Sequence, residues 1–302
     1  MITGISHIEM RSRCFDESRE IYGTHLGLTE IQNTTAVLNE KSEWESVVSK
    51  TFGDRKAIFQ VGDSFLIIQE DLEAPTELSV DGRPTREPSG SVAHWSFFVE
   101  GNQHAYSHWK NFLDVYRFTA TSDGPSVQPM NHQYLQRSLL EFYDPSGHPI
   151  QTSEIVDPRS EKQKRRREKQ GIASLANGTV IKGFDHIRMH CPDIRKGKEL
   201  YVEKLGLTII EHRETEINDL YALSAGLCDI ELNFKKDGSN SSQFGRGVVG
   251  SFGFWSDDVD ALAKQIQHHS HSRKRDLTLG VPVKSITLDV GDGFPVEVSQ
   301  RL

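Results

Sequence analysis

The sequence of 302 residues contains only three cysteines, Cys14, Cys191 and Cys228, and none of them has the Cys-x-x-Cys spacing of a zinc or iron–sulfur site. It has no apolar run approaching the ~18 residues of a membrane span. Its first residues lack the basic start and apolar run of a signal peptide. It also lacks an excess of positive charge, since its formal net charge is -8. These absences predict a cytoplasmic protein with reduced thiols that binds neither membranes nor nucleic acids.

The bulk composition is that of a globular protein. Hydrophobic residues make up 36% of the chain and charged residues 26%, which are ordinary values for soluble domains. A chain of this length can bury a substantial core, and its length favours about two domains.

One stretch of the sequence occurs twice. Residues 4–10 read GISHIEM and residues 183–189 read GFDHIRM. Both alternate apolar and polar residues, which predicts a half-buried strand that carries a histidine. Each is followed by a helical pattern and the word Leu-Gly-Leu-Thr, whose glycine lies 20 positions after the histidine in both copies. This equal spacing indicates a duplicated unit, with Gly27 and Gly206 at the expected ends of the two helices.

Two further units begin with similar strands. Residues 92–99 read VAHWSFFV and residues 248–255 read VVGSFGFW. Each is followed by a helical stretch and by strands that a turn connects. The chain therefore predicts four small α+β units in two pairs. The sequence leaves open whether neighbouring units form one hollow or whether units are exchanged between halves or subunits.

The expected domains are residues 1–156 and residues 183–302, joined by a charged linker over residues 157–182. The linker contains the run EKQKRRREK at residues 161–169. Such a run suits a nucleic-acid or membrane patch, but in an acidic chain it favours an exposed interdomain helix.

The first half offers three candidate metal ligands, His7, His94 and Gln151. The two histidines open corresponding strands, and Gln151 belongs to the last strand of the second unit. Strands that curve around one hollow would point all three side chains inward. Two imidazoles and one oxygen ligand leave open positions, which suits Fe(II), Mn, Ni or Zn chemistry on a bidentate substrate. Gln151 brings an amide oxygen without the usual negative charge.

These features resemble the vicinal oxygen chelate superfamily, which includes glyoxalase I, fosfomycin-resistance thiol transferases, bleomycin-resistance proteins and extradiol ring-cleaving dioxygenases. The resemblance implies an α+β fold of four βαβββ modules that form two tandem glyoxalase/dioxygenase-like domains with curved mixed sheets. The motifs that carry it are Ser6-His7-Ile8, Leu26-Gly27-Leu28, Ala93-His94-Trp95 and Asp144-Pro145-Ser146-Gly147-His148-Pro149-Ile150.

The same resemblance implies further site residues. Extradiol dioxygenases usually hold their metal in the second half, which would be His186, Ser251 and Glu297, although Ser251 departs from the pattern. Glu231 falls where glyoxalase I has a metal carboxylate, so His186, Glu231 and Glu297 form an alternative site. His132 resembles the acid/base histidine of the dioxygenases, and its ordinary pKa near neutrality suits proton transfer.

Three functions follow as expectations. The first is an extradiol-like dioxygenase that uses a divalent metal, with Fe(II) favoured over Mn, Ni or Zn, the first-half ligands and His132. The second is a glyoxalase-like lyase, isomerase or thiol transferase, which Glu231 and Glu297 favour. The third is a non-catalytic binder of the resistance type, because a fold does not determine a function. In each case the expected partner is a small organic molecule, and a homo-oligomer is left open.

Overall fold

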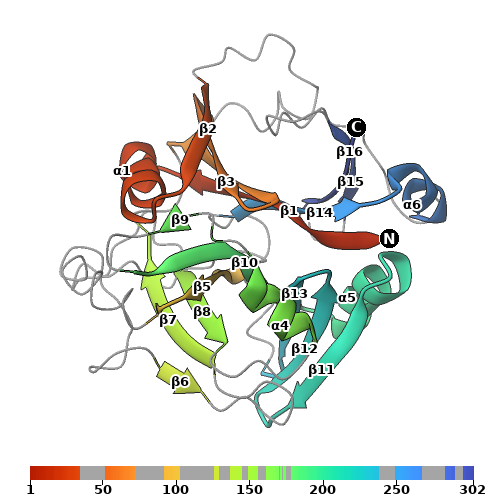
Figure 1. Cartoon of the computed structure of the whole chain (residues 1–302). Coiled ribbons are helices and arrows are strands. Elements are labelled where there is room, and N and C mark those ends of the chain that lie inside the picture. The colour runs from red at the N-terminus through yellow and green to blue at the C-terminus, as the bar shows by residue number, and fades with distance from the viewer. Residues whose placement is uncertain are drawn as a thin grey trace.

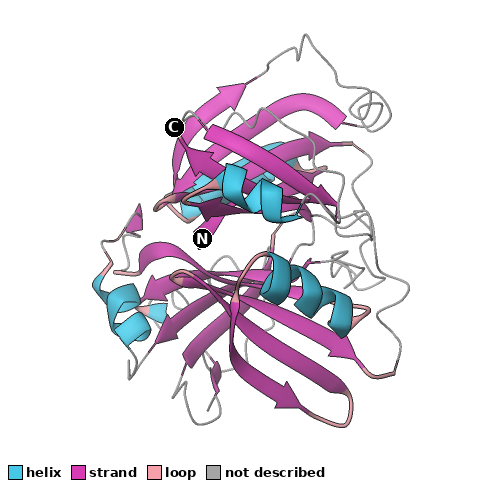
Figure 2. Ribbon diagram, turned by 90° about the vertical axis from the view of Figure 1, so that its right-hand side faces the viewer, coloured by secondary structure: helices cyan, strands magenta, loops and turns pink. Residues whose placement is uncertain are grey.

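Two curved, mixed β-sheets stack on one another in the computed structural model of the chain (Figures 1 and 2). Among the described residues the helices are short, and none is long and apolar enough to cross a membrane. The structure describes residues 1–34, 52–72, 92–102, 126–128, 137–144, 149–155, 161–169, 171, 173–174, 178–237, 249–266, 283–289 and 295–302.

The first sheet has seven strands. Their spatial order is β15 (Val283–Asp289), β16 (Pro295–Arg301), β14 (Val249–Ser256), β1 (Ile2–Ser12), β4 (Ser64–Asp71), β3 (Phe52–Val61) and β2 (Thr29–Thr34). The central strands β1 and β14 run antiparallel, whereas β1 is parallel to β4 and β14 is parallel to β16. This sheet therefore joins the first predicted unit to the fourth.

The second sheet has nine strands and repeats the same plan. The spatial order is β11 (Thr208–Glu214), β12 (Asn218–Ala225), β13 (Cys228–Lys235), β10 (Val180–His190), β5 (Val92–Glu100), β8 (Pro149–Ile155), β7 (Arg137–Tyr143) and β6 (Ser126–Gln128), with β9 (Ala173–Ser174) beside β10. Here β10 and β5 are the antiparallel centre, flanked by the parallel strands β13 and β8. This sheet joins the third unit to the second.

The helices follow the strands that carry the repeated histidines. After β1 comes α1 (Phe15–Glu20), which continues as a π-helical segment, Ile21–His25. After β10 come α5 (Ile194–Lys198) and a π-helical segment, Glu199–Lys204. In the part of the chain that the structure describes, the other helices are α4 (Glu161–Glu168) and α6 (Val259–Ile266).

The two glycines predicted to end the helices are confirmed as left-handed positions. Gly27 has φ +66° and Gly206 has φ +72°, a conformation that glycine adopts without a steric penalty. The predicted α+β architecture of four related units is confirmed too. Each sheet, however, takes strands from both of the expected domains, so the division at residues 157–182 does not separate the sheets.

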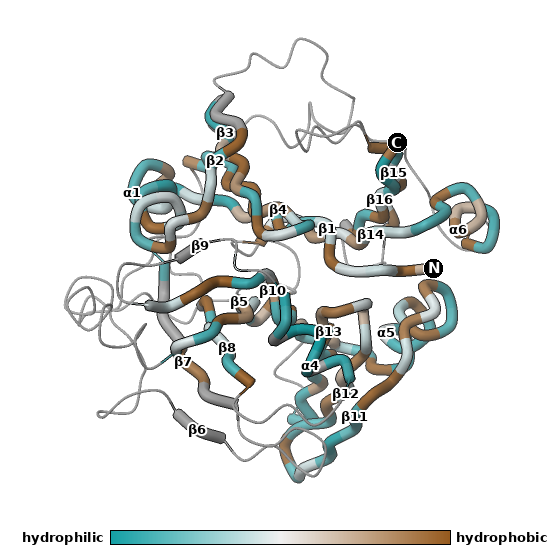
Figure 3. Tube along the Cα trace, in the orientation of Figure 1, coloured by the Kyte–Doolittle hydropathy of each residue, from teal (hydrophilic) through white to brown (hydrophobic). Residues whose placement is uncertain are grey.

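The main core lies between the two sheets and includes aromatic contacts from one layer to the other. Tyr22, which follows β1, stacks on Trp95 of β5 with ring centroids 6.0 Å apart. Tyr201, which follows β10, packs edge-on against Phe254 of β14 at 6.4 Å. Apolar residues are concentrated along the strands, whereas α4 is hydrophilic along its length (Figure 3). The second face of each sheet points away from this shared core.

The turn between β12 and β13 presses on the backbone of β1. A Cβ atom at Gly226 would lie only 1.8 Å from the carbonyl oxygen of Thr3, and Gly226 has φ +64°. Gly206 has a similar positive φ, but no atom lies within 4 Å of the Cβ that it would carry. A substitution at Gly206 therefore tests backbone strain alone, whereas one at Gly226 tests backbone strain together with a steric clash between the sheets.

We expect Gly206→Ala to lower the free energy of unfolding by about 1 kcal/mol, which is the usual penalty of a left-handed alanine. Gly226→Ala adds a clash between backbones and should lower it by at least about 3 kcal/mol. Equilibrium urea unfolding of the two variants measures the difference. Equal losses would contradict the close approach of this turn to β1.

Candidate metal centre

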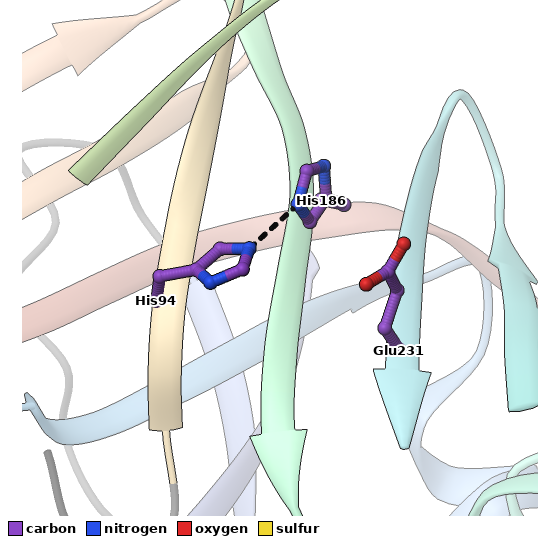
Figure 4. Close-up of side chains that lie close together, drawn as sticks. All are labelled: His94, His186 and Glu231. Atoms are coloured by element: carbon purple, nitrogen blue, oxygen red, sulfur yellow. Dashed lines mark hydrogen bonds between the residues drawn. The ribbon is translucent and has the colours of Figure 1, made fainter. Parts of the chain in front are cut away.

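His94, His186 and Glu231 lie together on the face of the second sheet that points away from the shared core (Figure 4). They come from β5, β10 and β13, which are adjacent strands. Their potential ligand atoms all lie within 4.8 Å of one another. The Nε2 atoms of the two imidazoles are 3.0 Å apart, and the rings meet edge-on.

Strand register explains why these three residues meet. Arg188 on β10 pairs with His94 on one side and with Glu231 on the other. His186 lies two positions before Arg188 and therefore shares its face, because side chains alternate along a strand. The alternation of the repeated sequence thus places one histidine of β10 between a histidine and a carboxylate from neighbouring strands.

The orientation of His186 is set by the residue before it. Its Nδ1 lies 2.7 Å from Oδ2 of Asp185, which is fully buried. A carboxylate accepts the Nδ1 proton, so the lone pair of the neutral ring is on Nε2, the atom that faces His94. A carboxylate behind a histidine is the usual support of a metal-binding imidazole.

Gln151 is close to the cluster by register. It lies on β8 opposite Ser96 of β5, and Ser96 lies opposite His186 of β10. Gln151 is only 5% exposed. Its amide therefore belongs to the same buried face as the two imidazoles, where its oxygen is chemically able to serve as an additional ligand.

The donor set fits a divalent transition metal. Imidazole nitrogens and a carboxylate suit Zn, Fe, Ni or Mn. Two nitrogens each about 2.1 Å from one ion, at right angles to one another, are about 3 Å apart, which is the separation that His94 and His186 have. The chemistry of these residues is thus consistent with a resident metal ion.

No protein-family model and no curated protein matches the sequence. Solved structures do match it. A proposed dioxygenase from Bacillus subtilis has 17% identity and a TM-score of 0.64, and the match covers 99% of this chain and 86% of that chain. Glyoxalase I from Zea mays has 11% identity and a TM-score of 0.61, with 98% of this chain and 92% of that chain covered.

The chain has the vicinal oxygen chelate fold. Its four modules form two equivalent pairs. The residue pairing between β1 and β14 matches the residue pairing between β10 and β5. The first sheet therefore has four positions that correspond to the cluster and Gln151. Position by position these are His7 for His186, Ile67 for Glu231, Ser251 for His94 and Glu297 for Gln151.

Of the four equivalent positions in the first sheet, two carry an imidazole or a carboxylate, namely His7 and Glu297. Nε2 of His7 lies 3.6 Å from Oε2 of Glu297, and both side chains are fully buried. Ile67 supplies no donor and packs in an apolar cluster with Ile58 and Phe65. Of the two sheets, the second therefore has the fuller donor set.

The expected grouping of His7 with His94 and Gln151 is corrected by the structure. His7 lies in the first sheet, whereas His94 and Gln151 lie in the second. Of the alternative grouping, the structure brings His186 and Glu231 together, whereas Glu297 lies beside His7 in the first sheet. Both corrections have one cause, which is that the second unit pairs with the third and the first with the fourth.

His132, the expected acid/base residue, lies outside the described residues, so its role stays a prediction. Arg188 was missed as a site residue, although its position two residues after a candidate ligand in the repeated strand was a usable signal. Its Nε lies 3.7 Å from Oε2 of Glu231, and its side chain is partly exposed.

Two basic residues lie on the strands of the cluster, Arg188 on β10 and Lys235 on β13. Burial lowers the pKa of His190 to about 4, and the positive charges of Lys235 and Arg188 contribute. His190 is therefore neutral at physiological pH. A cationic rim of this kind favours anionic or oxygen-rich small molecules.

The first sheet offers a gain-of-function test. We expect the double variant Ile67→Glu/Ser251→His to add two donors beside His7 and Glu297, and so to bind one more metal ion per chain than the parent. Metal analysis after dialysis against Zn²⁺ measures the stoichiometry. Ile67→Glu alone is the matched control, because it adds one donor and should not create a tight site.

A buried glutamate destabilises the metal-free protein, so the melting temperature of the double variant should fall without metal and recover when Zn²⁺ is added. An unchanged stoichiometry in a folded double variant would mean that the four positions of the two sheets are not equivalent.

Proposed function

We propose that the protein is a metal-dependent enzyme that acts on a small organic substrate with two neighbouring oxygen atoms. The observation that carries this proposal is the convergence of His94, His186 and Glu231 from three adjacent strands. The similarity to glyoxalase I and to a proposed dioxygenase supports the fold of such an enzyme, and the donor set supports the metal.

In this proposal His94, His186 and Glu231 hold the metal, with Gln151 as a fourth ligand. When bound, a divalent metal supplies Lewis-acid chemistry to a chelated substrate. Arg188 attracts and orients a negatively charged group of the substrate, because it is charged and partly exposed next to Glu231. The Glu231 carboxylate is placed to act as a general base on a carbon acid.

Gln151 determines which reaction class the centre favours. If Gln151 also held the metal, four protein ligands would leave room for the two oxygens of a chelated substrate but not for dioxygen as well. A carboxylate at the Glu231 position is also the glyoxalase-like feature of the chain. We therefore favour a lyase, isomerase or thiol-transferase reaction that does not consume oxygen.

The second candidate is an extradiol-like dioxygenase. Two histidines and one carboxylate with three open positions are the ligand set of non-haem Fe(II) oxygenases. This alternative requires that Gln151 does not bind the metal. Oxygen uptake by the Fe(II)-loaded protein with a panel of catechols tests it, and turnover of α-ketoaldehyde–thiol adducts under nitrogen tests the first candidate.

We expect purified wild-type protein without an affinity tag to hold one divalent metal ion per chain. His94→Ala, His186→Ala and Glu231→Gln should each lower the metal affinity by more than about 100-fold, because loss of a ligand costs more than loss of its outer support. Competition with a chromophoric chelator measures the affinity of each variant.

His7→Ala is the matched control, since it removes the equivalent histidine of the first sheet and should leave the affinity unchanged. Folded wild-type protein that holds no metal after reconstitution with Fe(II), Mn, Ni and Zn would refute the enzyme proposal and leave a non-catalytic binder.

A further inference from the structure

The charged linker helix α4 is not a solvated spacer, as the sequence suggested, because one of its arginines is buried. Arg166 is 2% exposed, although α4 is otherwise hydrophilic. Burial of a guanidinium costs free energy unless its donors are matched by acceptors. The contacts of Arg166 therefore indicate what α4 does.

Arg166 binds the residue that supports His186. Its Nη1 donates to Oδ1 of Asp185 at 2.8 Å, and its Nη2 donates to the main-chain oxygen of Asp185 at 2.8 Å. Its Nε donates to the main-chain oxygen of Leu227 in the turn between β12 and β13. The arginine thus fixes both the side chain and the backbone of Asp185.

The other oxygen of Asp185 receives the Nδ1 proton of His186 at 2.7 Å. A continuous series of polar contacts therefore runs from α4 through Asp185 to the imidazole whose Nε2 faces His94. Each member of the series is buried, so water does not compete for these contacts. Movement of Arg166 would release one side of the carboxylate that orients the ring.

A second basic residue one helical turn earlier reinforces the contact. Nζ of Lys162 lies 2.6 Å from Oδ1 of Asp229 and 2.7 Å from Oγ of Ser224. Asp229 pairs with His186 across β10 and β13, and its second oxygen lies 3.4 Å from Nη2 of Arg166. Two cations of α4 therefore match two buried carboxylates beside His186.

The first sheet provides an internal comparison. By register, Ser6 occupies the position of Asp185 there, and Phe65 occupies the position of Asp229. Ser6 contacts Nδ1 of His7 through a neutral hydroxyl at 3.0 Å. The acidic pair occurs only beside the fuller donor set, and the cations that match it come from α4.

We propose that α4 is a structural part of the metal centre and that Arg166 is a positioning residue that acts on His186 through Asp185. This inference rests on the proposed function, because it assigns a role toward the metal. Its consequence is that docking of α4 and metal binding strengthen each other, since coupling between two binding events is reciprocal.

Metal affinity of a small set of variants tests the proposal. Arg166→Met should weaken Zn²⁺ binding by about 10- to 100-fold, the usual effect of losing an outer support of a ligand. Arg165→Met is the matched control, because Arg165 is exposed on the same helix, and it should change the affinity less than about twofold. Arg166→Lys should give an intermediate affinity, since one ammonium cannot reproduce the paired contacts of a guanidinium.

A double-mutant cycle separates positioning from general destabilisation. In the background Asp185→Asn, the change Arg166→Met should weaken Zn²⁺ binding less than about twofold further if Arg166 acts through Asp185. A full additional loss would overturn the route through Asp185. Wild-type affinity in a folded Arg166→Met protein would overturn the positioning role alone, whereas absence of metal binding by the wild type would overturn the proposed function with it.

Hydrogen exchange of α4 provides a measurement that does not depend on variants of Arg166. Saturation of the wild-type protein with Zn²⁺ should slow exchange in residues 161–169 by at least about tenfold, through the same coupling. The His186→Ala protein should show no slowing. Equal exchange with and without Zn²⁺ in a wild-type protein that binds the ion would overturn the proposal.

Discussion

Antiparallel pairing of β10 with β5 is the interaction on which the candidate site depends. It brings the third module against the second and places Arg188 opposite His94, with His186 on the same face. The equivalent pairing of β1 with β14 builds the other sheet. In both strand pairs, one face packs in the shared core and the other lies inside the curve of its own sheet (Figure 1). A slip of the register by one residue would therefore move apolar side chains out of the core.

Much of this architecture was predictable from the sequence, because its information is local. The alternation around the two repeated histidines predicts β1 and β10, and the glycines at 27 and 206 mark the helix ends. Four related units follow from these patterns. The proximity of the candidate ligands was only partly predictable: His186 and Glu231 were expected together, since the parallel strands β10 and β13 belong to one module. Their partner His94 was not, because module pairing depends on long-range contacts that local patterns do not contain.

Equivalent histidines of the two sheets have different surroundings. In the first sheet the ring of His7 lies over Gly253, where a Cβ atom would come within 2.5 Å of Cε1. The second sheet has Ser96 at that position, and the ring of His186 faces His94 instead. Ile67 adds to the apolar cluster at the place where the second sheet has Glu231. A few substitutions on one scaffold thus yield a buried His–Glu pair on one side and a convergent donor set on the other.

Pairing of the first module with the last has a consequence for biosynthesis. While the ribosome makes the chain, β1 emerges first but its antiparallel neighbour β14 emerges only near the end. The second sheet can assemble earlier, because its modules are adjacent in the chain. The edge of β1 that pairs with β14 therefore stays without this partner during most of translation. Pairing of strands that are far apart in the sequence is slow, and an unpaired strand edge is prone to aggregation. The order of synthesis therefore allows the sheet that carries the candidate centre to complete its central pairing before the other sheet can.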